Sequence, residues 1–371
     1  LTPSQFSLAI SGFYITYILF EVPSNIILKR TDAVKWLSFI MFAWGLTTLV
    51  MAFSHDFAAL FACRLLLGGF IPGILYLLSK SYKPNQVTWR VAIFVSMASV
   101  SGIVSGPIAY ATSYLDGQHD LNSWQYLFII EGAPTICLSV VAYFYLFDDI
   151  SKVSWLTPHQ KEVHRSSMET EETHAVVSIR TVIKACFDWK TCLFSLTYIL
   201  SATIFTSYQV FLPIIIDGFG FPVLTSQLLS APPNAVQAFG TLLGGYITDS
   251  LKNKRGAVMA TGFFISALGF LLLGTLEHRW AKYGSLFIIP LGVGLQNAAN
   301  ISWSAVNFPV LEVRAVAVAV VVMVGNVGGV IASYLYPMND KPQYGKYRYV
   351  GLKQKAKCSQ CLAIRSTWQL V

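Results

Sequence analysis

The sequence predicts an all-α integral membrane protein made of two helical bundles, and three observations lead to this class. Of its 371 residues, 54% are hydrophobic and 12% are charged, whereas a soluble domain carries about 25% charged residues. Ten apolar stretches, each near the roughly 20 residues that cross a bilayer as a helix, contain only three charged residues, Glu21, Arg64 and Glu131. One polar segment divides these stretches into two sets of five. A soluble enzyme would leave this pattern unexplained.

The ten stretches are the expected transmembrane helices. They cover residues 6–28, 36–53, 57–79, 91–115, 124–147, 191–216, 225–248, 256–276, 283–308 and 315–337. We therefore divide the chain into an N-terminal bundle (1–147), a cytoplasmic linker (148–190), a C-terminal bundle (191–337) and a polar basic tail (338–371). In the linker, Thr157 and Gln160 form a capping-box pattern around Pro158, which predicts a short surface helix over about 158–168.

The basic residues of the loops predict the orientation. One alternating set of loops carries 16 Lys and Arg residues, and the other set carries two, Arg279 and Lys282. Because cytoplasmic loops are enriched in Lys and Arg, the first set is expected to face the cytoplasm. Both termini would then lie outside, although the tail carries seven basic residues and one acid. We therefore expect a chain that lacks one further span at each end.

The charge and the cysteines exclude other classes. Most of the net charge of +8 lies in the tail, so nothing points to a nucleic-acid partner. Cys358 and Cys361 form a lone CxxC without a second pair, which we interpret as a coincidence and not as a zinc site. We expect no metal and no cofactor, and the absence of a nucleophile or acid–base cluster argues against an enzyme.

Several motifs occur in the order of a known family. They include Phe20-Glu21-Val22-Pro23-Ser24-Asn25, Trp124-Gln125-Tyr126-Leu127-Phe128-Ile129-Ile130-Glu131-Gly132, Gln227-Leu228-Leu229-Ser230 and Gly325-Asn326-Val327-Gly328-Gly329. In these residues the chain resembles the anion:cation symporter family of the major facilitator superfamily, in its fungal allantoate/nicotinate permease branch. The resemblance implies helices 2–11 of a twelve-helix fold, with helices 1 and 12 absent.

The resemblance also implies a function. It implies a secondary active transporter of a small organic anion, a carboxylate such as allantoate, nicotinate or a related vitamin or nitrogen source. Proton symport by alternating access, a plasma-membrane location and a monomeric state would follow. The sequence departs from the family in the fourth helix, where Gly68–Gly73 is four residues shorter and lacks a glutamate that serves proton coupling in related symporters. The rival hypothesis is a truncated remnant that does not transport.

The three intramembrane charges are the first site candidates. Arg64 has no acid in its own stretch, and a guanidinium suits a carboxylate ligand. Its alternative roles are a structural pair with Glu131 or Glu21, or extension of the side chain toward the nearer membrane interface. Glu131 is a candidate for proton coupling or a packing residue, and Glu21 for a gating ion pair or a contact at the helix end.

Polar and aromatic residues in the second half complete the candidate set. By the family fold, the stretches that contain Tyr208, Gln209, Asn297, Asn300 and Trp303 line a central cavity, so these residues are candidates for substrate binding; helix–helix hydrogen bonding is the alternative. In the loop after Gly245, Asp249 and Arg255 resemble the superfamily's cytoplasmic gating motif. Positive-inside anchoring accounts for Arg255 but not for Asp249.

Overall fold

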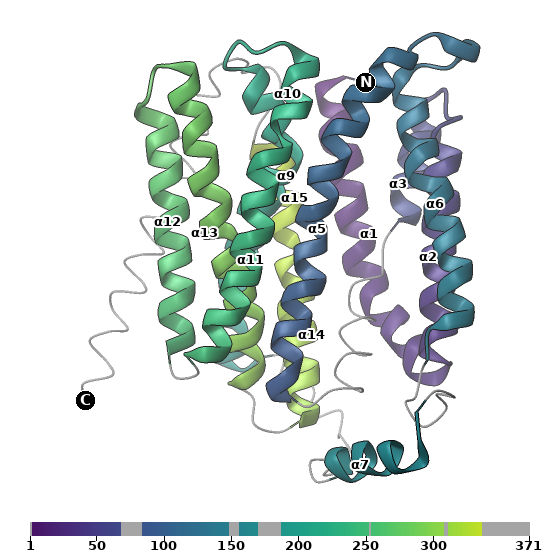
Figure 1. Cartoon of the computed structure of the whole chain (residues 1–371), viewed down its shortest axis with the longest axis vertical. Coiled ribbons are helices and arrows are strands. Elements are labelled where there is room, and N and C mark those ends of the chain that lie inside the picture. The colour runs from purple at the N-terminus through teal and green to yellow at the C-terminus, as the bar shows by residue number, and fades with distance from the viewer. Residues whose placement is uncertain are drawn as a thin grey trace.

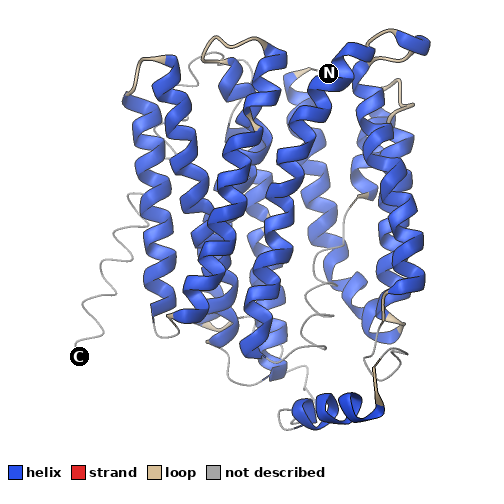
Figure 2. Ribbon diagram, viewed as in Figure 1, coloured by secondary structure: helices blue, strands red, loops and turns tan. Residues whose placement is uncertain are grey.

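The structure is a computed structural model, and it describes residues 2–67, 84–147, 156–169, 187–251, 254–307 and 311–335. Within these ranges the chain consists of helices joined by loops, with no strand (Figure 2). This agrees with the all-α class that the apolar stretches predict.

The described part of the N-terminal bundle holds five α-helices. They are α1 (Pro3–Arg30), α2 (Ala33–Met51), α3 (Phe57–Leu66), α5 (Pro84–Thr112) and α6 (Ser123–Tyr145). Two short 3-10 helices, η1 (Ser113–Leu115) and η2 (Gln118–Asp120), connect α5 to α6. Helix α2 packs along α6, and glycine permits this approach, because a Cβ added at Gly132 would lie 2.9 Å from the backbone nitrogen of Leu49.

The second half of the chain forms the C-terminal bundle. Its helices are α9 (Trp189–Asp217), α10 (Val223–Leu229), α11 (Ala231–Ser250), α12 (Arg255–Thr275), α13 (Arg279–Val306), α14 (Leu311–Gly325) and α15 (Val327–Leu335). Its core is an apolar cluster between α9 and α13, with Leu212, Ile216, Leu286 and Ile289 fully buried. The two bundles meet where α5 packs along α11 and where α1 packs against α15.

The linker contains α7 (Pro158–Glu169), which lies below the ends of the spans (Figure 1). It begins where the capping box predicts: the Thr157 backbone nitrogen donates to Gln160 Oε1 at 3.0 Å, and the Gln160 nitrogen donates to Thr157 Oγ1 at 3.3 Å. Following the charge bias of the loops, we refer to the end that carries α7 as the cytoplasmic end. The N-terminus lies at the opposite, outer end.

Each of the ten predicted stretches contains a helix, but two are interrupted. Stretch 225–248 is divided at Ser230 into α10 and α11, and Pro232 and Pro233 fall in the first turn of α11, where a missing backbone N–H breaks no hydrogen bond. Stretch 315–337 is divided at Asn326 into α14 and α15. The remainder of stretch 57–79, after residue 67, and the tail lie outside the described residues.

Five of the described helical segments are long and apolar enough to cross a membrane. They are Ala33–Met51, Trp89–Leu115, Ser123–Tyr145, Trp189–Asp217 and Arg255–Thr275. Shorter apolar segments occur in α1, α3 and α14–α15. Helices α11 and α13 are long enough but carry buried amides, among them Asn234, Gln237, Gln296 and Asn300. Their polarity follows from an interior position, because polar side chains are costly in lipid.

Several hydroxyl groups inside the spans bond to their own helix. Thr16 Oγ1 donates to the Gly12 carbonyl oxygen at 3.0 Å, and Thr203 Oγ1 donates to that of Ile199 at 2.7 Å. Such bonds satisfy the hydroxyl where no water is present. Serine and threonine in the apolar stretches are therefore compatible with membrane-spanning helices.

Candidate functional site

Arg64 and Glu131 lie at the same depth of the N-terminal bundle. Both α3 and α6 begin at the outer end; Arg64 is the eighth residue of α3 and Glu131 is the ninth of α6. At a rise of about 1.5 Å per residue, each lies roughly 11–12 Å along its helix. Sequence positions 67 residues apart are therefore brought to one level.

The two charges attract each other without forming an ion pair. Arg64 is half-buried and Glu131 is exposed on α6, and each contributes to the electrostatic environment of the other. Their nitrogen and oxygen atoms do not approach within the 4.0 Å of a salt bridge. The guanidinium thus retains hydrogen-bonding capacity for another carboxylate.

Helix α9 carries two polar contacts to the N-terminal bundle. Gln209 Nε2 donates to the carbonyl oxygen of Ala98 in α5 at 3.2 Å, and the hydroxyl of Thr206 lies 3.1 Å from that of Tyr14 in α1. Thr206 and Gln209 are three residues apart and so share one face of the helix. This face of α9 is the one that meets the other bundle.

A second set of polar contacts joins α1 to α15. The hydroxyls of Ser11 and Ser333 lie 2.8 Å apart and are both buried. Gly329 packs directly on the ring of Tyr14. The sequence alone does not identify Ser11 or Tyr14, because a single hydroxyl in an apolar stretch forms no distinguishing pattern. The glycines of α15 are the sequence feature that indicates close helix packing here.

Close approach of α5 to α11 and α10 depends on two glycines. A Cβ added at Gly102 would lie 2.7 Å from Asn234 Nδ2, and one added at Gly106 would lie 2.5 Å from the Gln227 carbonyl oxygen. The GxxxG spacing predicts such packing. The structure shows that the helices packed against this part of α5 belong to the C-terminal bundle.

Tyr208 and Trp303 lie in packed cores. The Tyr208 side chain is 2% exposed within the α9–α13 cluster, and its hydroxyl donates to the Leu286 carbonyl oxygen at 2.8 Å. Trp303 lies at the cytoplasmic end of α13, where its ring meets that of Phe194 edge-on at 5.2 Å and packs against Gly256. These placements favour packing roles for both side chains, the alternative to lining a cavity.

Three amides of α13 differ in their surroundings. Gln296 and Asn300 are fully buried, and no hydrogen-bond partner reaches their side-chain amide atoms. Asn297 is half-buried. On this helix Val293 faces α9 and Gly294 faces α11. With about 100° per residue, Asn297 falls between those two directions, in the sector between α9 and α11.

The gating candidates occupy the cytoplasmic end. Asp249 is the penultimate residue of α11 and Arg255 is the first of α12, and the carboxylate of Asp249 attracts the guanidinium across the loop. Glu21 falls within α1, and its side chain is outside the described part of the structure.

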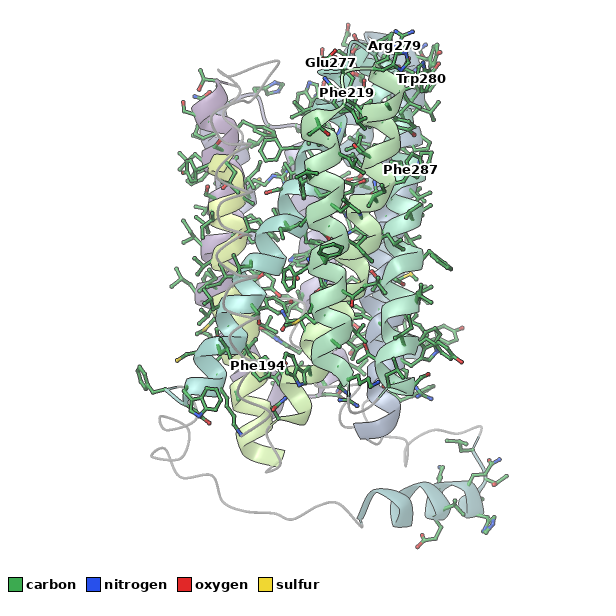
Figure 3. The ribbon with its side chains drawn as sticks, turned by 90° about the vertical axis from the view of Figure 1, so that its left-hand side faces the viewer. Phe194, Phe219, Glu277, Arg279, Trp280 and Phe287 are labelled. Atoms are coloured by element: carbon green, nitrogen blue, oxygen red, sulfur yellow. The ribbon has the colours of Figure 1, made fainter. Side chains whose placement is uncertain are left out.

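Basic residues at the outer end are held on aromatic rings. The Arg279 guanidinium carbon lies 5.5 Å from the ring centre of Phe221, and Lys282 Nζ lies 5.9 Å from that of Phe219. Figure 3 shows Phe219, Arg279 and Trp280 together at this end and Phe194 at the other. Arg279 and Lys282 are the two basic residues in the loops assigned to the outer side, and these cation–π contacts give them a structural role.

The described residues contain no group of three or more His, Cys, Asp or Glu side chains placed to hold a metal ion. Cys358 and Cys361 lie outside the described ranges.

Comparison with known proteins agrees with this architecture. Residues 1–333 match the sequence profile described as "Major Facilitator Superfamily". The chain is 30% identical over 354 residues to "MFS transporter prlL" of Fungal sp. (strain NRRL 50135), covering 93% of this chain and 71% of the relative. It is 25% identical to "Major facilitator-type transporter hxnP" of Emericella nidulans, covering 98% and 76%.

Solved structures show the same fold. A bacterial homologue of the human lysosomal transporter Spinster, in an inward-facing and unoccupied conformation, matches with a TM-score of 0.68 at 18% identity, over 95% of this chain and 78% of that one. A point mutant of the nucleoside transporter NupG matches with a TM-score of 0.63 at 12% identity, over 96% and 88%. The chain therefore belongs to the major facilitator superfamily, as a multi-pass membrane protein and secondary transporter and not an enzyme.

Proposed function

We propose that this transporter carries a small organic anion, a carboxylate, together with protons by alternating access of the two bundles. The observation that carries the proposal is Arg64, an intramembrane guanidinium that Glu131 attracts without pairing with it. Charged groups inside a membrane are costly and mark substrate or ion pathways. The planar guanidinium matches a carboxylate through two parallel hydrogen bonds.

The contacts between the bundles support alternating access. Ser11 with Ser333 and Tyr14 with Thr206 lie in the outer half of α1. The cytoplasmic half of α1 instead carries exposed Leu19 and Phe20. The bundles also meet near the cytoplasmic end, where a Cβ added at Gly245 of α11 would lie 2.5 Å from the Cβ of Ala92 in α5. A few hydrogen bonds of about 1 kcal/mol each can be exchanged during a cycle.

Glu131 is the proposed proton carrier. Its side chain is exposed while that of Arg64 is half-buried, so a proton can reach the carboxylate without opening the packing of α6. A carboxylate that gains a proton no longer attracts Arg64, which leaves the guanidinium to the substrate. Proton uptake and anion binding are coupled in this way through a single electrostatic contact.

Polar groups of the second bundle complete the proposed pathway. Gln209 lies on the face of α9 that meets α5, and Asn297 lies in the sector of α13 between α9 and α11. Asn300 is the less suitable candidate because it is fully buried. The attraction between Asp249 and Arg255 is the proposed cytoplasmic gate, and we further propose action as a monomer in the plasma membrane.

The test is uptake of radiolabelled nicotinate and allantoate into proteoliposomes with an imposed pH gradient. We expect Arg64→Gln to lower uptake at least tenfold and Arg64→Lys to restore it only in part, because an ammonium lacks the planar fork. Arg279→Gln, which removes a basic residue at the outer end, is the matched control and should transport normally. Undiminished uptake by Arg64→Gln would remove Arg64 from the mechanism, and absence of carboxylate uptake by the unaltered protein would favour the non-transporting alternative.

A further inference from the structure

A groove runs between α2 and α6 at the cytoplasmic end, away from the contacts between the bundles. Its volume is about 250 Å³, and its walls come from Lys35, Ser38, Phe39, Phe42, Ser139, Val140 and Tyr143. Pockets for drug-sized solutes measure about 300–1,000 Å³. The groove is therefore small for such a solute but suited to a segment of a hydrocarbon chain.

The deeper part of the groove is apolar and open to the bilayer. Phe39 is 59% exposed, Phe42 40% and Val140 48%. These residues lie about one and a half to two and a half turns from the cytoplasmic start of α2 and the cytoplasmic end of α6, at the depth where acyl chains begin.

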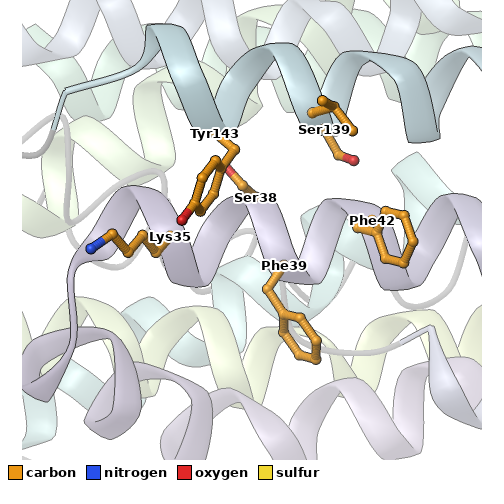
Figure 4. Close-up of a pocket in the computed structure, with 7 residues that line it drawn as sticks. Lys35, Ser38, Phe39, Phe42, Ser139 and Tyr143 are labelled. Atoms are coloured by element: carbon orange, nitrogen blue, oxygen red, sulfur yellow. The ribbon is translucent and has the colours of Figure 1, made fainter.

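The lining of the groove is mainly apolar, and polar residues border its cytoplasmic end. Figure 4 shows Lys35, Ser38 and Tyr143 at one end of the groove and Phe42 toward the other. Ser38 is 5% exposed, and its hydroxyl has no hydrogen-bond partner. This hydroxyl is covered by its surroundings, so Lys35 is the side chain at this end that can reach a charged ligand group.

The surroundings place this end at the membrane surface. The last three residues of α6 are Tyr143, Phe144 and Tyr145, and each side chain is at least 49% exposed. Aromatic residues concentrate at the interface between lipid and water, and a lysine there extends its ammonium toward the headgroups. The polarity of the groove thus runs in the same direction as that of a lipid in the cytoplasmic leaflet.

We propose that this groove binds an anionic phospholipid of the cytoplasmic leaflet. The Lys35 ammonium donates to the phosphate, and one acyl chain lies along Phe39, Phe42 and Val140. The positive charge of Lys35 favours an anionic lipid over a zwitterionic one, because it attracts a headgroup that carries a net negative charge.

Asp32 limits the strength of this site. Its Oδ2 lies 3.7 Å from Lys35 Nζ, and its Oδ1 accepts from the Val34 backbone nitrogen as the N-cap of α2. Asparagine caps a helix as well as aspartate does. Asp32→Asn therefore releases the lysine without removing the cap.

Native mass spectrometry of the purified protein tests the proposal. With equal amounts of phosphatidylglycerol and phosphatidylcholine, we expect the unaltered protein to retain one phosphatidylglycerol preferentially. Lys35→Gln should reduce that preference about fivefold, the contribution of one basic residue beside anionic lipid, and Asp32→Asn should increase it. Val140→Trp, which fills the groove from an exposed position, should abolish retention. Lys190→Gln, at the equivalent cytoplasmic start of α9, is the matched control and should leave retention unchanged.

Three results would overturn the proposal. One is a preference for phosphatidylglycerol that survives Lys35→Gln; another is retention that survives Val140→Trp with an unchanged melting temperature. The third is displacement of the lipid by glycerol 3-phosphate at equal concentration, which would assign the site to a soluble phosphate and not to a phospholipid.

Discussion

The side-chain nitrogen of Gln209 lies 3.2 Å from the carbonyl oxygen of Ala98, so an amide of the C-terminal bundle is hydrogen-bonded to the backbone of the N-terminal bundle. Separation of α9 from α5 would break this bond. We predict that Gln209→Leu shifts the conformational equilibrium two- to tenfold toward the state in which these helices separate, because one hydrogen bond contributes about 0.5–1.5 kcal/mol. Distances between spin labels on the outer ends of α5 and α11 would measure the shift.

Thr275→Val is the control for this variant. Thr275 bonds only within α12, to the carbonyl oxygens of Leu271 and Leu272, so its loss removes a hydrogen bond without touching the other bundle. An equal shift in both variants would contradict a specific role for Gln209.

Glycine at position 106 is required for the approach of α5 to α10. A Cβ there would lie 2.5 Å from the Gln227 carbonyl oxygen. A backbone atom cannot avoid this clash by a change of rotamer, as a side chain could. We predict that Gly106→Ala destabilises the protein by about 1–3 kcal/mol, measured as a lower melting temperature in detergent.

Gly284 provides the matched control. It also lies within a helix, but nothing is found within 4 Å of an added Cβ. Gly284→Ala should be neutral or stabilise by up to about 1 kcal/mol, since alanine favours helix. Equal melting temperatures for the two variants would show that α5 and α10 can separate at Gly106 without cost.

The sequence predicted the helices well and the site only in part. Span length and hydropathy act locally, so each of the ten stretches contains a helix. Hydropathy alone does not show the interruptions at Ser230 and Asn326, which prolines and glycines accompany in the sequence. Register explains why adjacent candidates differ: Tyr208 and Gln209 point about 100° apart, so one enters the core and the other meets α5. The Ser11–Ser333 contact joins residues 322 positions apart, which a single sequence cannot pair.

The attraction between Arg64 and Glu131 is measurable as a coupling energy. Removing either charge leaves the other without its compensation, while removing both does not. We predict that the Arg64→Gln/Glu131→Gln double variant is more stable than the sum of the two single effects by up to about 1 kcal/mol, a modest value because Glu131 is exposed. Melting temperatures of the four proteins give the cycle, and strict additivity would show that the two charges act independently.

Tyr208 and Asn297 separate a packing role from a substrate role. Tyr208→Phe keeps the ring in its cluster and loses the 2.8 Å bond to the Leu286 carbonyl oxygen, so we predict a loss of about 0.5–1.5 kcal/mol in stability with an unchanged KM for carboxylate uptake. Asn297→Ala removes a half-buried amide from the sector between α9 and α11, so we predict a raised KM with an unchanged melting temperature. Initial rates of uptake across substrate concentrations, paired with thermal melts, decide between the roles. A raised KM in Tyr208→Phe at constant stability would return Tyr208 to the substrate pathway, because packing alone could not produce that combination.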